Sequence, residues 1–385
     1  MTVMRILTQR KPKSPQRIIM AQTALSWSID SQASDLSGLV LQNQRPVPEL
    51  GDKDVLVELR AASLNYRDLV VAKGKGGLVA PPGAIPGSDG AGVVVKIGSQ
   101  VQNLQPNDRV VTHMVPDKFP ADATPPLGDD ELPGWSHICA GLGQEMNGTL
   151  TTYGVFPESC LVKFGDGMSF EEAATLACSG ITAWNALMGL EGKQVKKGDW
   201  VLVQGSGGVS VAALQFAVAV GAIVVATTSS EEKGSTLKAL GASHIVNYRQ
   251  TPSWGAAAKE LTPSGRGFDI IVDVGGNATL SQSVAAVRRN GVITVVGMIG
   301  EADVEPTPMM AVLFVACVVR GILLGSRTMM RSMVKFVEDN DIKLALDDEV
   351  FALANVKDAF RRLEEQKHFS KVVIQIPGKI QSEEA

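Results

Sequence analysis

Cysteine is scarce in this chain of 385 residues, and the four that are present, Cys139, Cys160, Cys178 and Cys317, lie far apart. Their spacing excludes a close-set zinc cluster of cysteines and argues against a framework of disulfide bonds. Proteins without such a framework are typical of reducing compartments. We therefore expect a cytoplasmic protein.

Long apolar runs and an excess of positive charge are also missing. The most apolar segment, 311–324, is interrupted by Arg320 and Gly321, whereas a membrane span needs roughly 20 apolar residues. It is better predicted as a buried helix followed by a strand. The net charge of −4 gives no basic surface for nucleic acid. The sequence thus predicts a globular protein with neither a membrane nor a nucleic acid as partner.

Acidic residues are absent from the N-terminal stretch 5–17, which holds five basic residues. This composition fits a flexible tail, with a weak organelle-targeting segment as the alternative. We expect an N-terminal extension over residues 1–25 and folded sequence from about Ser26.

The most informative segment is 201–217, which combines an apolar run, several glycines and a second apolar stretch. It predicts a buried strand, a tight turn and a helix over 208–220. Glycines let the backbone approach a dinucleotide pyrophosphate, and the N-terminus of the helix offers N–H groups and a partial positive charge. The expected cofactor contacts in this turn are Gly205, Ser206, Gly207, Gly208 and Val209.

The pattern around this turn alternates between strands and helices. Short β-branched runs predict strands at 200–203, 222–226, 269–273 and 292–296, separated by helices at 208–220, 231–240 and 279–289. Runs of this kind are typical of a buried parallel sheet. The succession predicts a doubly wound α/β domain with right-handed crossovers.

The sequence before and after this region has a different pattern. Closely spaced strands at 54–59, 90–98 and 108–112 indicate an antiparallel, barrel-like domain. Residues 116–148 are rich in proline and glycine and are predicted as a long loop. A helix at 356–366 between two short strands is expected to return to the first domain.

Several motifs resemble those of the medium-chain dehydrogenase/reductase superfamily. They include Asn65-Tyr66-Arg67-Asp68, Gly180-Ile181-Thr182-Ala183-Trp184, Leu240-Gly241-Ala242 and Phe369-Ser370-Lys371-Val372-Val373. The resemblance runs from about Ser26 to Ile376. It implies an α/β fold in which a GroES-like, β-barrel-type catalytic domain is interrupted by a Rossmann domain. The expected limits are 26–172 for the catalytic domain, 173–335 for the Rossmann domain and 336–385 for the C-terminal return.

The zinc ligands of the superfamily's alcohol dehydrogenases are largely replaced in this chain. Asn65 stands at the first ligand position and Ser88 at the histidine position, and only Cys178 is a suitable donor. Catalytic zinc normally needs three protein ligands, so we expect no metal. The pattern resembles the zinc-independent quinone oxidoreductase and enoyl reductase branch.

This branch implies hydride transfer from NADPH to the conjugated C=C bond of an enone or enal, or to a quinone. The alternatives are a zinc-free alcohol or aldehyde oxidoreductase, and a protein that binds NADPH without significant turnover. The resemblance also implies a homodimer that is joined through the last Rossmann strand, which is placed near 321–325.

The choice between NADPH and NADH depends on the end of the second Rossmann strand. No acidic residue stands there for the ribose 2′-hydroxyl of NAD, whereas Thr228, Ser229 and Lys233 offer hydroxyls and a cation for a 2′-phosphate. Tyr248 matches a tyrosine that flanks this phosphate in related quinone reductases. The acidic pair 231–232 is contrary evidence, although acids are also favoured in the first turn of a helix. We expect NADP(H).

The expected catalytic residues are Asn65 and Tyr66. By resemblance, Asn65 is a hydrogen-bond partner of the nicotinamide ribose or of the substrate carbonyl, and Tyr66 is a proton donor or a stacking ring. In the simpler interpretation, Asn65 is only the amide of a turn after a strand, and the ring of Tyr66 only packs in the core or at the rim of the site. Thr182 is expected near the nicotinamide, and Gly275 and Gly297 complete the expected cofactor site.

Overall fold

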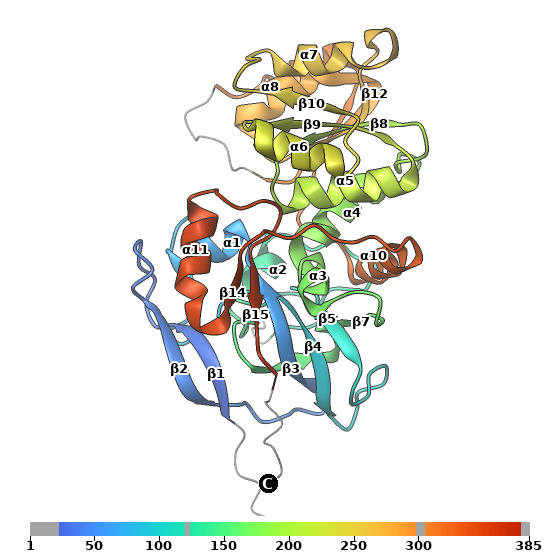
Figure 1. Cartoon of the computed structure of the whole chain (residues 1–385). Coiled ribbons are helices and arrows are strands. Elements are labelled where there is room, and N and C mark those ends of the chain that lie inside the picture. Colours follow the sequence, from blue (N-terminus) through green and yellow to red (C-terminus); the bar gives the residue numbers. More distant parts are fainter. Residues whose placement is uncertain (1–22, 120–123, 298–304, 379–385) are drawn as a thin grey trace, which may run out of the picture.

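The computed structural model describes residues 23–119, 124–297 and 305–378. The prediction of a flexible extension falls mostly on residues 1–22, which lie outside the described residues. Two sheets with different strand patterns form the two halves of the molecule, and the C-terminal part of the chain runs along the junction between them (Figure 1).

The first half is built on a mixed, mainly antiparallel sheet of seven strands in the order β14-β15-β3-β4-β5-β7. A seventh strand, β6 (Tyr153–Pro157), also pairs with β3. The C-terminal β15 pairs with β3 in antiparallel orientation, with Val373 opposite Ser63, so the C-terminal part of the chain returns to the sheet of the first half. The other strands are β3 (Asp54–Ser63), β4 (Asp89–Ile97), β5 (Arg109–Thr112), β7 (Leu161–Lys163), β14 (Val350–Ala352) and β15 (Val373–Gln375).

A separate hairpin and three helices complete this half. The hairpin pairs β1 (Thr23–Ile29) with β2 (Leu39–Pro46), and β1 begins slightly before the expected start at Ser26. The helices are α1 (Tyr66–Ala72), α2 (Trp135–Ala140) and α11 (Val356–Glu364).

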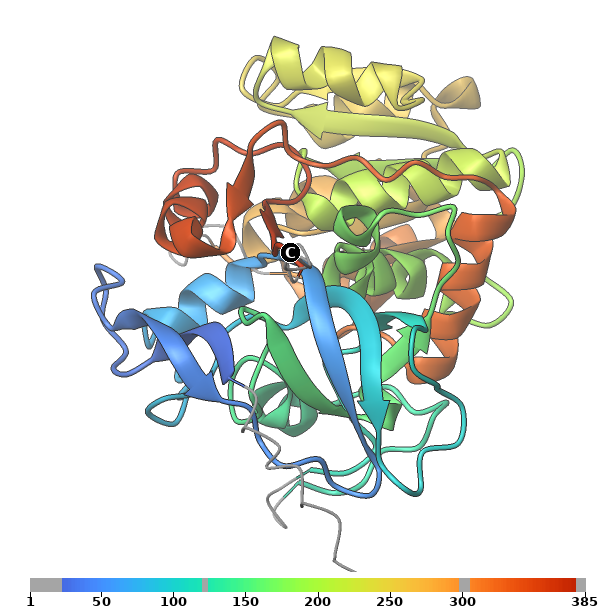
Figure 2. The same ribbon diagram turned by 60° about the horizontal axis from the view of Figure 1, so that its bottom comes forward.

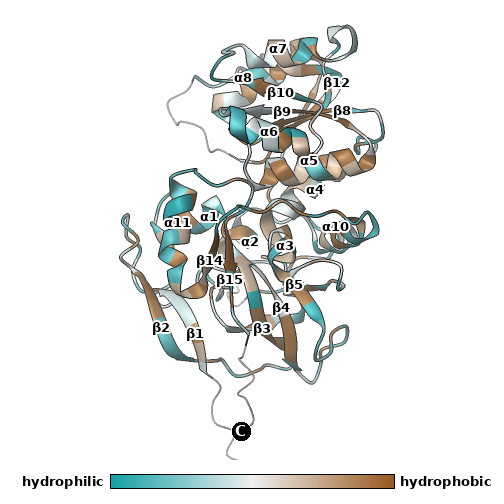
Figure 3. Ribbon diagram, in the orientation of Figure 1, coloured by the Kyte–Doolittle hydropathy of each residue, from teal (hydrophilic) through white to brown (hydrophobic). Residues whose placement is uncertain are grey.

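The second half is a parallel six-stranded sheet in the order β10-β9-β8-β11-β12-β13, which is the expected doubly wound arrangement. All five residues of β8 are buried, as suits a strand covered on both faces. In Figure 3 the central strands are coloured hydrophobic, whereas α6 and α11 carry hydrophilic outer surfaces. The strands are β8 (Trp200–Gln204), β9 (Ile223–Thr228), β10 (His244–Asn247), β11 (Phe268–Asp273), β12 (Val287–Val295) and β13 (Val318–Gly321).

The helices of this half follow the strands. They are α5 (Gly208–Val220), α6 (Glu231–Ala239), α7 (Trp254–Glu260), α8 (Asn277–Ala286), α9 (Met309–Val315) and α10 (Arg327–Asp339). Helix α5 ends at Gly221, whose left-handed φ of 88° is a conformation that glycine adopts without steric cost. None of the helices in the described ranges is long and apolar enough to cross a membrane.

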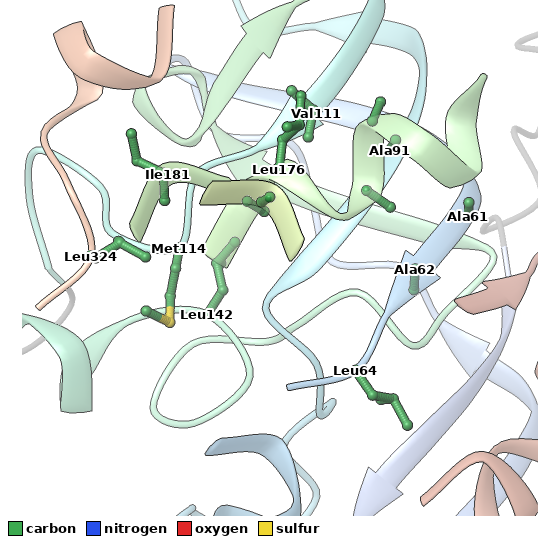
Figure 4. Close-up of a cluster of buried hydrophobic side chains, with 14 of the residues drawn as sticks. Ala61, Ala62, Leu64, Ala91, Val111, Met114, Leu142, Leu176, Ile181 and Leu324 are labelled. Carbon is green, nitrogen blue, oxygen red and sulfur yellow. The ribbon is translucent and has the colours of Figure 1, made fainter. Parts of the chain in front are cut away.

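A helical segment joins the two halves. It consists of α3 (Phe170–Ala174), the π-helical turn η2 (Leu176–Gly180) and α4 (Ile181–Met188). Ser169 caps α3 and exchanges hydrogen bonds with Glu172, so the two residues form a capping box. Leu176 and Ile181 pack with side chains of β3, β4 and β5 in one apolar cluster (Figure 4). The junction is therefore held by a core that both halves share.

Four expectations about elements were wrong. The segment 116–148 is not all loop, because α2 forms within it and Arg67 donates hydrogen bonds to the carbonyls of Ile138 and Leu142. The helix expected at 279–289 ends at Ala286, because Val287 has extended backbone and pairs with Phe268.

The other two errors concern the end of the Rossmann sheet. The last strand lies at 318–321 rather than 321–325, because Leu324 takes a left-handed φ of 63° and its carbonyl accepts a hydrogen bond from Asn185. The segment 311–324 is a helix and a strand as expected, but its helix is not buried. Phe314 in α9 is 81% exposed.

Candidate active site

The glycine-rich turn lies between β8 and α5, where the sequence places it. Gly205 has a left-handed φ of 77°, and Gly207 is the N-cap residue of α5. A Cβ atom added to either glycine would meet no heavy atom within 4 Å, so the space above the turn is open. Together with the N–H groups of the first helical turn, this open cradle fits the pyrophosphate of a dinucleotide.

The underside of the same turn is tightly packed. A Cβ atom on Gly208 would lie 2.5 Å from Cδ of Lys371 and 2.7 Å from Oγ of Ser179. Ser210 replaces the last glycine of the common fingerprint, and its hydroxyl donates to the carbonyl of Gln204 over 2.6 Å. Ser210 thus ties the first turn of α5 to the end of β8.

Four further predicted cofactor residues follow strand ends on one edge of the parallel sheet. Thr228 ends β9, and Ser229 follows it directly, whereas Gly275 and Gly297 come just after β11 and β12. Parallel strands end on the same edge, which is where doubly wound folds bind ligands. The structure thus brings these residues to the edge that holds the glycine-rich turn.

Lys233 and Tyr248 differ in how they are placed. The ammonium of Lys233 donates to the carbonyls of His368, over 2.9 Å, and Gln366, over 3.2 Å. Lys233 therefore holds the C-terminal segment in this structure, and burial lowers its pKa. Tyr248 is 41% exposed, and its backbone N–H donates to Thr228. Tyr248 is thus partly exposed beside the end of β9.

The remaining predicted residues lie at the junction. Thr182 is buried in the first turn of α4, next to the π-helical turn η2 that carries Cys178 and Ser179. Turns of this kind are frequent at functional sites. Asn65 and Tyr66 stand at the start of α1, where Asn65 is buried and Tyr66 is 48% exposed.

A buried polar cluster surrounds Asn65. The Nζ atom of Lys371 lies 2.5 Å from Oδ1 of Asn65, 2.8 Å from the carbonyl oxygen of Leu64 and 3.2 Å from Oδ2 of Asp89. The hydroxyl of Ser88 donates to the other oxygen of Asp89 over 2.8 Å. Lys371 lies between α11 and β15, in the C-terminal part of the chain that is drawn in red in Figure 2. One buried cation therefore bonds Asn65 directly and is linked to Ser88 through Asp89.

Asp68 adds a second carboxyl to this cluster. Its Oδ2 atom accepts the backbone N–H of Asn65 over 2.7 Å, and its Oδ1 atom is buried without a hydrogen-bond partner. Burial, together with the nearby charge of Asp89, raises the pKa of Asp68 to about 6. The bond from the Asn65 N–H to Asp68 fixes the backbone at the start of α1.

The donor set does not fit a catalytic zinc ion. Within the described ranges, no group of three or more His, Cys, Asp or Glu side chains is placed to hold a metal. Burial and the charge of Asp89 raise the pKa of Cys178 to about 12, whereas zinc binds the thiolate form. The ammonium of Lys371 would also repel a cation beside Asn65.

The role of Lys371 in this cluster is not evident from sequence. The segment Phe369-Ser370-Lys371-Val372-Val373 signals only membership of the superfamily. The position of the Lys371 side chain depends on the pairing of β15 with β3. It also depends on the hydrogen bond from the N–H of Ser370 to the carbonyl of Ser206 in the glycine-rich turn.

Comparisons with known proteins agree with this arrangement of domains. Residues 51–166 match the family model of the alcohol dehydrogenase GroES-like domain, and residues 208–339 match that of zinc-binding dehydrogenases. A zinc-type alcohol dehydrogenase-like protein of Schizosaccharomyces pombe is 38% identical over 356 residues, which cover 92% of this chain and 99% of that protein. The chain belongs to the medium-chain dehydrogenase/reductase superfamily.

Two further members of the superfamily are informative. A solved structure of an NAD-dependent alcohol dehydrogenase is 31% identical with a TM-score of 0.79, over 92% of this chain and all of the other. A crotonyl-CoA reductase of Streptomyces collinus is 29% identical over 71% of this chain and 68% of its own length. This dehydrogenase/reductase is thus an oxidoreductase with a nicotinamide cofactor.

Proposed function

We propose that the protein is an NADPH-dependent reductase of conjugated carbonyl compounds or quinones that works without zinc. The observation that carries the proposal is the cluster of Asn65, Ser88 and Lys371, which puts an amide, a hydroxyl and an ammonium at the place of a zinc site. Reduction of a conjugated system needs less electrophilic help than oxidation of an alcohol, for which zinc is the main electrophile. The similarity to a crotonyl-CoA reductase supports enoyl reduction.

The proposed cofactor is NADPH. Thr228 ends β9 and Ser229 follows it, so hydroxyl groups stand there rather than a carboxylate, and the backbone N–H of Tyr248 donates to Thr228. Lys233 is near enough in the chain to pair with a 2′-phosphate if it releases the carbonyl of His368. The similarity to an NAD-dependent alcohol dehydrogenase favours NADH instead, so the activities with NADPH and NADH must be compared directly.

The bound nicotinamide would supply the hydride, and the protein would supply position and electrostatics. The open turn at Gly205 and Gly207 would hold the pyrophosphate, and Thr182 in α4 would lie toward the nicotinamide. Asn65 would face the reacting oxygen. Tyr66, half-exposed at the start of α1, would bind or protonate the substrate from its accessible side.

The test is the consumption of NADPH and NADH, followed with enones, quinones, saturated aldehydes and saturated ketones, with and without a chelator. The proposal predicts chelator-resistant oxidation of NADPH with conjugated substrates. Activity on saturated carbonyls that a chelator abolishes would contradict it. Ser229→Asp should shift the preference from NADPH toward NADH, because a carboxylate repels the 2′-phosphate; Ser235→Asp, on α6, serves as the control for added charge.

A second candidate function is the oxidation of alcohols or the reduction of aldehydes without zinc. It is favoured by the 38% identity to a zinc-type alcohol dehydrogenase-like protein. Rates on an enone and on its saturated ketone separate the two functions. A protein that binds NADPH and turns over none of these substrates would be a binding protein, which is the third alternative.

We also propose a homodimer that is joined along β13. This strand is the edge of the parallel sheet, with Met309 and Phe314 of the neighbouring α9 about four-fifths exposed. Pairing of two such edges would cover unpaired backbone groups and apolar side chains. Light scattering during gel filtration should give twice the mass of one chain, and Phe314→Glu should reduce it to the mass of a monomer.

A further inference from the structure

Lys371 is a lysine with almost no access to water. The residue is 3% exposed, and its ammonium carries three N–H donors. The three oxygen atoms around it belong to Asn65, Leu64 and Asp89, at 2.5, 2.8 and 3.2 Å. Every donor of the ammonium thus has a protein acceptor, so Lys371 has none left for a substrate.

This arrangement fixes the orientation of the Asn65 side chain. An ammonium has no acceptor atom, so the amide atom that faces it must be the oxygen. The hydroxyl of Ser179 donates to the same oxygen over 3.4 Å. The NH2 group of Asn65 therefore points away from Lys371, and its one contact among the described residues is a long 3.5 Å bond to Ser88.

We propose that Lys371 is a positioning residue that turns the N–H donors of Asn65 toward the reacting oxygen of the substrate. The proposal rests on the proposed function and adds to it the group that replaces a metal as electrophile. Without Lys371, the amide could rotate and present its oxygen, which would repel a developing negative charge. An N–H donor fixed in a buried site stabilises such a charge without reorganisation.

The chemistry can be written for an enone. A hydride from the reduced nicotinamide forms a C–H bond at the β-carbon, and the π electrons of the C=C bond shift toward the carbonyl. The carbonyl oxygen becomes an enolate oxygen, which accepts a hydrogen bond from Asn65. A proton from solvent then adds to the α-carbon and restores the carbonyl. The substrate gains one hydride and one proton, and the nicotinamide is oxidised.

A different role for Lys371 would have a different kinetic signature. Its Cδ atom lies 2.5 Å from the position of a Cβ on Gly208, so the side chain runs directly beneath the glycine-rich turn. If Lys371 turned to bind the pyrophosphate, its loss would weaken cofactor binding. A loss of positioning would lower kcat at saturating NADPH and leave cofactor affinity nearly unchanged.

The experiment measures Lys371→Met in an Asp89→Asn background, against Asp89→Asn alone, so that no carboxylate is left buried without its cation. Asn65→Asp is the companion variant, because it keeps an oxygen for Lys371 and removes the N–H donors. Each variant is assayed for kcat and KM with an enone, for NADPH affinity by fluorescence titration, and for its melting temperature.

We expect kcat to fall about 100-fold for the Lys371→Met comparison and for Asn65→Asp, as for the loss of one oxyanion donor, with NADPH affinity changed less than threefold. An unchanged kcat with weaker NADPH binding would overturn the inference in favour of a pyrophosphate ligand. If the Lys371→Met variant does not melt cooperatively, Asn65→Asp decides alone, and a kcat within threefold of the wild-type value overturns the inference.

Failure of the proposed function would look different. It would show as a wild-type protein that reduces no enone or quinone. The same variants would then be compared on a saturated aldehyde, because its carbonyl oxygen also gains negative charge during reduction and would accept the same hydrogen bond from Asn65.

Discussion

The buried carboxyl of Asp68 should make the stability of the protein depend on pH in an unusual direction. Asp68 is 1% exposed, and its pKa is raised from 3.8 to about 6 by burial and by the charge of Asp89. A raised pKa means that the folded state holds this proton more tightly than the unfolded state does. Stability from this group is therefore present below pH 3.8 and is lost as the pH rises toward 6.

The size of the effect follows from the shift. The difference between about 6 and 3.8 is roughly 2 units, and one unit corresponds to about 1.4 kcal/mol, so ionisation of Asp68 costs about 3 kcal/mol above pH 6. About 2 kcal/mol of this ionisation cost arises as the pH is raised from 4.5 to 7.5. Asp68→Asn should remove this cost, because the amide oxygen can still accept the N–H of Asn65 and the amide does not ionise.

The assay is urea unfolding of the wild type and of Asp68→Asn at pH 4.5 and 7.5. The stability of the wild type relative to the variant should fall by about 2 kcal/mol between these values. Other titrating groups cancel in this difference. Asp348→Asn is the matched control, because the Asp348 side chain is 89% exposed. A relative stability that is equal at the two pH values would refute the reasoning.

Three other changes test the packing that positions the site. Gly208→Ala should raise the KM for the cofactor about tenfold, measured by initial rates, because its Cβ would lie 2.5 Å from Lys371. Asp269→Ala should cost about 2–3 kcal/mol in urea unfolding, because the buried N–H of Trp200 loses its acceptor and two arginines lose a carboxylate. Trp27→Phe should cost about 1–2 kcal/mol in the same assay, because its indole N–H donates to a buried carbonyl over 2.6 Å.

The sequence predicts best what local chemistry determines. The glycine-rich turn needs an open backbone at Gly205 and a helix start at Gly207, and both requirements appear as residue types within a few positions. The strands of the parallel sheet are short β-branched runs, and their alternation with helices predicts parallel strands joined by right-handed crossovers. These patterns predict the α/β class and the doubly wound part, whereas the GroES-like part was implied by the resemblance to the superfamily.

The errors occur where tertiary contacts override local pattern. Val287 continues an apolar helical pattern, but its pairing with Phe268 begins a strand there. Residues 135–140 have no clear helical period, yet they form α2 against Arg67, which donates to two carbonyls in that region. A single sequence shows neither the partner strand nor the arginine.

The candidate site illustrates the same limit on a larger scale. Asn65 and Lys371 are 306 positions apart, and only the return of β15 to the edge of β3 brings them together. The sequence shows Asn65 and Ser88 at positions where related alcohol dehydrogenases carry zinc ligands. It does not show that the ammonium of Lys371 lies beside them. Burying the ammonium of Lys371 against the carboxylate of Asp89 is costly, because both charged groups lose their hydration. The buried pair of Lys371 and Asp89 therefore agrees with the role that we propose for Lys371, which is to hold the amide of Asn65 in one orientation toward the substrate.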